Sequence, residues 1–302
     1  QPKSVKPLTG SFNMDAQREY SVQMATLMQY DFNRGRLDAS AHPFTIDIHP
    51  TDVRITTRYS ESDFLEAISS TMHEVGHALY EQGLPQEWAG TPFGMARSMA
   101  VHESQSRLWE LFIGQSEAFW TGQLPTLNTL FPAFQSYTAQ DLVTLTHGVK
   151  PHWCRVASDI VTYNLHIILR YECEKDLISG ALSVRDLPRV WNQKMQDYLG
   201  IQVDSDAQGC LQDVHWSAGL FGYFPSYTLG TMISAELFGA LQRDISDLDT
   251  CIQSGKLEPI HAWLLDNVYR HGCRLTTQEL LEKLSVEYNA DRFMDRLRQG
   301  WG

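Results

Sequence analysis

The chain has 302 residues, of which 43% are hydrophobic, and a formal net charge of −12. This composition provides for a substantial core and favours a globular protein over a disordered chain. The negative charge and the lack of basic runs argue against nucleic acid and against an anionic membrane surface as partners. The chain contains no stretch of 18 apolar residues that could span a bilayer, and its first residues do not resemble a signal peptide.

The first part of the chain predicts a helix, a short β-hairpin and a second helix. Residues 15–33 have the pattern of a helix with a polar face. Residues 45–48 and 53–59 are rich in β-branched residues and flank a turn at 49–52, which predicts an antiparallel hairpin. Residues 60–63 resemble a capping box, and apolar residues follow at helical spacing until Gly83 and Pro85.

The remainder of the chain predicts further helices and no further strand. The expected helices cover residues 93–119, 142–146, 156–179, 187–199, 231–243, 257–271 and 276–299, with an aromatic, glycine-rich loop in residues 216–230. We therefore expect a mainly α fold with one small antiparallel β-sheet. The five cysteines are odd in number and form no C-x-x-C pair, which predicts buried free thiols in a reduced, cytoplasmic setting.

The clearest chemical signal is His73-Glu74-Val75-Gly76-His77, inside the second predicted helix. Helical geometry places His73 and His77 on one face, about 6 Å apart along the axis. Two imidazoles at this spacing can bind one Zn²⁺, and Glu74 beside them can accept a proton from zinc-bound water. A chance match is the alternative. The marked helix around the motif and the acidic residues downstream of it favour a zinc site, which needs a third ligand and an open position.

Several acidic residues follow the motif and are candidates for the third ligand: Glu81, Glu87, Glu103, Glu110 and Glu117. Glu81 lies on the same helix, on the wrong side to complete a tetrahedron with the two histidines. Glu103 lies on the next predicted helix, and a helical hairpin would bring it alongside them. The polar neighbours in His102-Glu103-Ser104-Gln105 could orient the ligands. We therefore predict Glu103 as the third ligand.

An ordered set of motifs surrounds these residues: His42-Pro43-Phe44, Asp52-Val53-Arg54-Ile55-Thr56, the helix from His73, His102 to Gln105, and Gly209 to Trp216. Together they resemble the carboxypeptidase Taq family of zinc metallocarboxypeptidases, also called thermostable carboxypeptidase 1. A further family motif, I-R-x-x-A-D, is kept in part, since Arg155 and Asp159 are present but Cys154 and Ser158 replace Ile and Ala. The resemblance runs from about residue 9 to residue 299.

The resemblance implies a zincin-like catalytic domain that hydrolyses C-terminal peptide bonds with broad specificity. Zn²⁺ would be the cofactor, with Co²⁺ as a substitute, and Glu74 would be the general base. The partners would be peptides with a free C-terminus, and a homodimer is an option because the family commonly forms dimers. The small sheet would lie beside the zinc-binding helix.

The substrate carboxylate would be bound by an arginine, which offers two parallel charge-assisted hydrogen bonds. The resemblance implies Arg155 for this role, with Arg54 as the second candidate. The alternative for each is a structural ion pair, Arg155 with Asp159 and Arg54 with Asp52.

A last group of residues belongs to the G-x-x-Q-D-x-H-W motif and the segment after it. His215 or Tyr227 would donate a hydrogen bond to the oxyanion of the tetrahedral intermediate. Gln212 and Asp213 are assigned to substrate binding. The alternative is that both form a packed polar cluster with Trp216 that holds the loop.

The resemblance is limited to the C-terminal catalytic part of the family. We expect one catalytic domain over residues 1–302, without the helical N-terminal part that forms one wall of the substrate groove in the family. Two other functions stay open: a different H-E-x-x-H enzyme, either an endopeptidase or an aminopeptidase, and a non-catalytic zinc-binding scaffold derived from such an enzyme.

Overall fold

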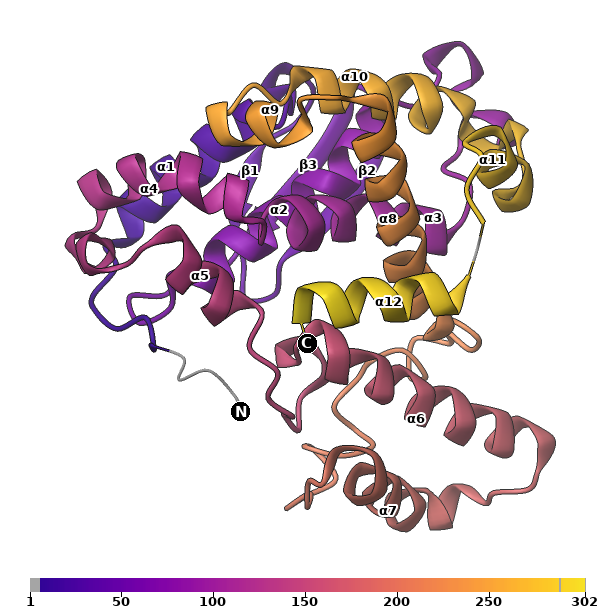
Figure 1. Ribbon diagram of the computed structural model, residues 1–302. Coiled ribbons are helices and arrows are strands. Elements are labelled where there is room, and N and C mark those ends of the chain that lie inside the picture. The colour runs from indigo at the N-terminus through magenta and orange to yellow at the C-terminus, as the bar shows by residue number, and fades with distance from the viewer. Residues whose placement is uncertain (1–5, 288, 302) are drawn as a thin grey trace. The chain divides into compact units, whose positions relative to one another are not determined.

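The computed structural model describes residues 6–287 and 289–301, and most of them are helical (Figure 1). The chain forms two compact units. The first contains the residues up to Thr146 together with Gly230–Phe293, and the second contains His147–Leu229 and the residues from Met294 onward. The predicted mainly α fold is confirmed, whereas the single catalytic domain stays a prediction. No helix of the described residues is long and apolar enough to cross a membrane.

The elements of the first unit are α1 (Met14–Leu27), β1 (Leu37–Ala39), β2 (Phe44–His49), β3 (Asp52–Thr57), α2 (Phe64–Gln82), α3 (Met99–Arg107), the π-helix η4 (Leu108–Ile113), α4 (Glu117–Leu130), α5 (Ala139–Thr146), α9 (Leu248–Ser254), α10 (Glu258–Asn267) and α11 (Thr277–Lys283). The second unit contains α6 (Ile160–Ser179) and α7 (Leu187–Leu199). Helix α8 (Pro225–Asp244) continues from the second unit into the first, and α12 (Ala290–Trp301) continues from the first into the second.

The sheet is small and mixed, with the strand order β1-β3-β2. Strands β2 and β3 are antiparallel, with Thr45 opposite Ile55, so the predicted hairpin is confirmed. The sequence reasoning missed β1, which runs parallel to β3, and the sheet is therefore not purely antiparallel. A strand of three residues is too short to show the alternation on which the prediction rests. The predicted first helix also ends earlier, at Leu27.

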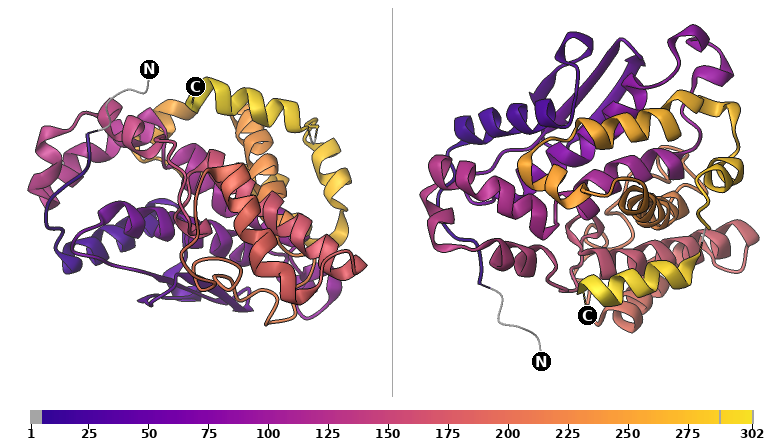
Figure 2. Two further views of the ribbon diagram at one scale, coloured as in Figure 1. Left: turned by 90° about the horizontal axis from the view of Figure 1, so that it is seen from below. Right: turned by 45° about the horizontal axis from the view of Figure 1, so that its top comes forward.

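Helix α2 carries the H-E-x-x-H motif and lies across one face of the sheet (Figures 1 and 2). It begins after Asp63, whose carboxylate accepts a hydrogen bond from Glu66 N at 3.1 Å. The predicted apolar face is buried, with Phe64, Met72 and Leu79 each 1% exposed. Each such side chain contributes about 1.5–3 kcal/mol to folding. Burial of this face fixes the rotation of α2 and hence the direction in which the motif points.

The other helices follow the prediction with local differences. The predicted helix 93–119 is broken because Ser98 caps α3 and Ser116 caps α4. Helix α8 begins at Pro225, inside the predicted loop, and the predicted helix 276–299 is divided into α11 and α12. Helix α9 was not predicted. The short 3₁₀ helices are η1 (Phe32–Arg34), η2 (Gln86–Trp88), η3 (Pro92–Gly94), η5 (Pro132–Ser136), η6 (Arg155–Ala157), η7 (Val184–Asp186) and η8 (Tyr269–Arg274).

All five cysteines are free thiols, as predicted. Three of them are buried, whereas Cys154 and Cys273 are partly exposed. The prediction of uniformly buried thiols is therefore wrong for these two. The cytoplasmic setting stays a prediction.

Candidate active site

Three side chains converge in the first unit: His73 and His77 from α2, and Glu103 from α3. One ligand atom of each lies within 4.8 Å of the other two. Glu103 Oε2 is 3.7 Å from His73 Nε2 and 3.3 Å from His77 Nε2. Two donors that each lie about 2.0–2.1 Å from a tetrahedral Zn²⁺ are about 3.4 Å apart. The donor types and their separations therefore fit a zinc ion held by these three residues.

Close packing of α2 against α3 brings Glu103 opposite the histidines. A Cβ atom on Gly76 would lie 2.7 Å from the Gln105 carbonyl oxygen and 2.7 Å from Ser106 Cα. Gly230 of α8 also packs tightly, since a Cβ atom there would lie 2.7 Å from Glu103 Cβ. The glycine inside the H-E-x-x-H motif thus permits the helix contact that places Glu103 beside the two histidines.

Arg107 and Glu110 orient two members of the cluster. Arg107 Nε donates to Glu103 Oε1 at 2.7 Å, which leaves Oε2 facing the histidines. Glu110 Oε2 lies 2.7 Å from His73 Nδ1, and its other oxygen accepts from the Ser69 hydroxyl at 2.8 Å. Burial opposes ionisation of Glu110, but the charges of Arg107 and His73 lower its pKa to about 2. An ionised Glu110 therefore holds the Nδ1 edge of His73 and leaves Nε2 toward Glu103.

His77 is held differently. Its Nδ1 lies 2.6 Å from Nδ1 of His102, and His102 Nε2 lies 2.8 Å from Glu81 Oε1. Glu81 is buried but does not belong to the three-residue cluster, in agreement with the sequence argument against it as a ligand. It contacts the cluster through His102 instead.

Glu74 lies in the same turn as His73 and is 7% exposed. The Thr45 hydroxyl, on the edge strand β2, donates to Glu74 Oε2 at 2.6 Å. Burial raises the pKa of Glu74 above its ordinary value, although His73 and Thr45 oppose the shift. A carboxylate with a raised pKa is suited to accept and return a proton near neutral pH.

The remaining acidic candidates lie outside the cluster, and Glu87 and Glu117 are exposed. The sequence reasoning missed the supporting roles of Thr45, Arg107 and Glu110. Arg107 and Glu110 follow Glu103 by four and seven residues, so they share one helix face with it, and this spacing could have identified them. Thr45 carried no comparable signal.

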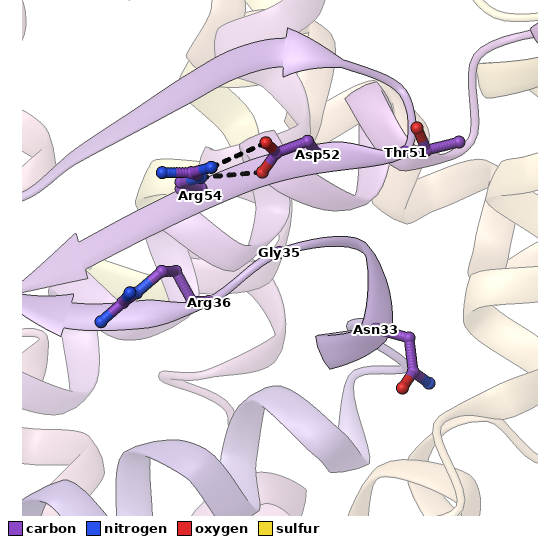
Figure 3. Close-up of a pocket in the computed structure, with 6 residues that line it drawn as sticks. All are labelled: Asn33, Gly35, Arg36, Thr51, Asp52 and Arg54. Atoms are coloured by element: carbon purple, nitrogen blue, oxygen red, sulfur yellow. Dashed lines mark hydrogen bonds and ion pairs between the residues drawn. The ribbon is translucent and has the colours of Figure 1, made fainter.

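Arg54 lies on the sheet, in a surface pocket that shares no residue with the cluster (Figure 3). Its guanidinium donates to both carboxylate oxygens of Asp52, each at 2.8 Å. The structure thus contains the ion pair that was the alternative to substrate binding. Arg36, which also lines the pocket, pairs with Asp38.

Arg155 belongs to a buried cluster within the second unit. Its Nε and Nη2 atoms lie 3.0 and 2.9 Å from Asp213 Oδ1, and its Nη1 donates to the Tyr163 hydroxyl at 2.7 Å. The suggested alternative of a pair with Asp159 is wrong, because Asp159 caps α6 by accepting from the backbone N–H groups of residues 161 and 162. Arg170 Nε binds the other Asp213 oxygen at 2.6 Å.

His215, Tyr227 and Gln212 adjoin this cluster. His215 Nε2 lies 2.9 Å from the Tyr227 hydroxyl, and the Tyr227 ring lies 4.8 Å from Arg155 Cζ. Burial and the charge of Arg155 lower the pKa of His215, which favours a neutral imidazole. Gln212 Oε1 accepts from Arg155 N at 3.0 Å. The polar cluster expected as an alternative is therefore present, although Trp216 donates to Glu174 instead of to Gln212 or Asp213.

Comparison with known proteins gives one consistent result. Carboxypeptidase 1 of Bacillus subtilis (strain 168) is 43% identical over 290 residues, which are 94% of this chain and 58% of the relative. Thermostable carboxypeptidase 1 of Thermus thermophilus is 43% identical over 276 residues, 91% of this chain and 54% of the relative. The chain thus spans somewhat more than half the length of these curated relatives.

Solved structures agree with this result. The M32 carboxypeptidase from Deinococcus radiodurans R1 is 39% identical with a TM-score of 0.94, and the match covers 98% of this chain and 60% of that one. Trypanosoma cruzi metallocarboxypeptidase 1 is 38% identical with a TM-score of 0.93, covering 99% and 63%. The family model of the carboxypeptidase Taq (M32) metallopeptidases matches residues 1–300. The chain therefore belongs to the carboxypeptidase Taq (M32) family of metallopeptidases.

Proposed function

We propose that this protein is a zinc-dependent carboxypeptidase that hydrolyses C-terminal peptide bonds with broad specificity. The observation that carries the proposal is the convergence of His73, His77 and Glu103 at separations that suit one zinc ion, beside the buried Glu74. The relatives named carboxypeptidases support the same activity. Co²⁺ accepts the same donor set and is the proposed substitute.

When bound to these residues, Zn²⁺ would act as a Lewis acid toward the scissile carbonyl and toward water. Glu74 is the proposed general base. Its Oε2 accepts a hydrogen bond from the Thr45 hydroxyl, which orients the carboxylate, and we assign the transfer of a proton from the attacking water to Oε1. The same carboxyl then returns the proton to the leaving amine.

Arg155 is the proposed partner of the substrate's C-terminal carboxylate. An arginine has five N–H groups, and contacts with Asp213 and Tyr163 use three of those on Arg155. The other two N–H groups of Arg155 have no hydrogen-bond partner among the described residues and are available to a ligand. In this proposal Asp213 and Gln212 hold Arg155 in place, and His215 or Tyr227 donates to the oxyanion. Arg54 is the weaker candidate because Asp52 already binds its guanidinium at two points.

The activity can be tested with a pair of peptides that share a blocked N-terminus, one with a free and one with an amidated C-terminus. We expect release of the C-terminal residue from the free peptide alone, loss of activity after chelation, and recovery with Zn²⁺ or Co²⁺. The isosteric variant Glu74→Gln should lower kcat at least about 100-fold while zinc stays bound.

The same assay separates the alternatives. Internal cleavage of both peptides would indicate an endopeptidase, and cleavage that requires a free N-terminus would indicate an aminopeptidase. Zinc binding without any turnover would identify a scaffold. A homodimer and a cytoplasmic location stay predictions.

A further inference from the structure

A row of three side chains extends from His77 away from the metal cluster. His77 Nδ1 lies 2.6 Å from His102 Nδ1, and His102 Nε2 lies 2.8 Å from Glu81 Oε1. The side chains of His77 and His102 are each 13% exposed and that of Glu81 is 8% exposed. Water therefore has little access to this row, and its hydrogen bonds are satisfied within it.

The chemistry of the row determines where each hydrogen lies. A carboxylate can only accept, so His102 carries its hydrogen on Nε2, the nitrogen that faces Glu81. A neutral His102 then has a bare Nδ1, which accepts a hydrogen from Nδ1 of His77. This arrangement leaves His77 Nε2 without a hydrogen. That nitrogen is the one that lies 3.3 Å from Glu103 Oε2, on the metal side of the ring.

We propose that Glu81 and His102 form a positioning relay that fixes His77 in its metal-binding tautomer and conveys the negative charge of Glu81 toward the metal. The inference rests on the proposed function, because it assumes a metal at His73, His77 and Glu103. Neither Glu81 nor His102 belongs to that ligand group. Both are therefore positioning residues.

The relay makes the two metal-binding histidines unequal. Glu110, the partner of His73, also lies 3.3 Å from Arg107, which offsets part of its charge. Among the described residues, no lysine or arginine lies within 4.0 Å of Glu81, so its charge is not offset in this way. A hydrogen bond from a ligand imidazole to an anionic or strongly accepting partner raises the basicity of that ligand. The strength with which His77 Nε2 binds a metal thus depends on Glu81, which is two hydrogen bonds away.

The direct test is the tautomer of His102 in the zinc-loaded protein, measured by long-range ¹H–¹⁵N correlation spectra with labelled histidine. We expect the hydrogen on Nε2 of His102 and on Nδ1 of His77. A hydrogen on Nδ1 of His102 would overturn the relay even if zinc is tightly bound. That result would leave the proposed function intact. An unaltered protein that binds no zinc would instead refute the proposed function and the relay together, so the two failures can be told apart.

Zinc affinity, measured by competition with a chromophoric chelator, provides the second readout. Glu81→Gln keeps the volume of the side chain, and His102→Phe keeps the ring contacts but removes both nitrogens. We expect zinc binding to weaken about 10-fold in the first and up to about 100-fold in the second. Glu87→Gln is the matched control, because it makes the same chemical change at an exposed residue that follows α2. It should leave the zinc affinity unchanged. Unaltered affinity in Glu81→Gln and His102→Phe would overturn the proposal, and thermal unfolding of the metal-free variants would show that they fold.

Discussion

The substitution Gly76→Ala tests whether close packing of α2 and α3 creates the metal site. The added Cβ atom would lie 2.7 Å from the Gln105 carbonyl oxygen, about 0.7 Å short of the 3.4 Å at which ordinary contacts begin. Alanine favours a helix by about 1 kcal/mol over glycine, whereas overpacking costs about 1–3 kcal/mol. The metal-free protein should therefore lose at most about 2 kcal/mol of unfolding free energy.

The substitution should weaken zinc affinity more than it lowers the unfolding free energy of the metal-free protein. Relief of the contact moves α3, and with it Glu103, by several tenths of an ångström away from the histidines of α2. Metal–ligand distances tolerate only about 0.2 Å. We expect zinc affinity to fall at least about 10-fold, measured by chelator competition alongside urea unfolding of the metal-free protein.

Gly83→Ala is the control for this experiment because it crowds the same helix elsewhere. Its Cβ atom would lie 2.6 Å from the Tyr269 ring, at the C-terminal end of α2. It should lower stability by a similar amount and leave zinc affinity unchanged. Equal zinc affinity in Gly76→Ala and the unaltered protein would refute the reasoning.

Three further predictions concern single contacts. Thr45→Val removes the hydroxyl bound to Glu74, the proposed general base, and should lower kcat about 10-fold at constant KM, with Thr45→Ser restoring it. Asp213→Asn should cost about 3 kcal/mol at pH 7. Burial opposes ionisation of Asp213, but its two arginine partners hold its pKa below the ordinary 3.8. The difference in unfolding free energy between Asp213→Asn and the unaltered protein, measured in urea, should therefore reach its full size above about pH 4. It should shrink as the pH falls through the lowered pKa of Asp213. Burial likewise opposes a charge on His73, yet Glu103 and Glu110 raise its pKa to about 9, so zinc must displace a proton. Zinc added to the metal-free protein in weak buffer at pH 7 should release about one proton, and a pH indicator that detects none would contradict this prediction.

The elements that follow from local chemistry could be predicted. Helix α2 was predictable because its apolar spacing and its C-terminal glycine agree, although the helix is capped by Asp63 and not by the capping box expected over residues 60–63. The β2–β3 hairpin follows from its turn and its β-branched residues. The convergence of Glu103 with the histidines required only that two successive helices pack as a hairpin.

The contacts that depend on distant segments could not be predicted. A pair of Arg155 with Asp159, four residues away, was the alternative to substrate binding, but Arg155 binds Asp213, 58 residues away. Helical spacing permits the first pair, and only the path of the chain through the second unit decides between them. The contact between Thr45 and Glu74 also could not be predicted, because the two side chains meet only once the sheet packs on α2.

The balance of buried charge explains why this part of the first unit suits a dication. Glu103 contacts His73 and His77, and Glu110 contacts His73. Glu81 contacts His77 through His102. Among the described residues, Arg107 is the only arginine or lysine within 4.0 Å of any of the three carboxylates. In the metal-free protein the raised pKa of His73 keeps that imidazole protonated, so one negative charge is left over. Once His73 gives up its proton to bind a metal, two are left over, and an uncompensated charge is costly in a buried site. A bound Zn²⁺ cancels both, so the carboxylates that make the metal-free site unfavourable are the same ones that make metal binding favourable.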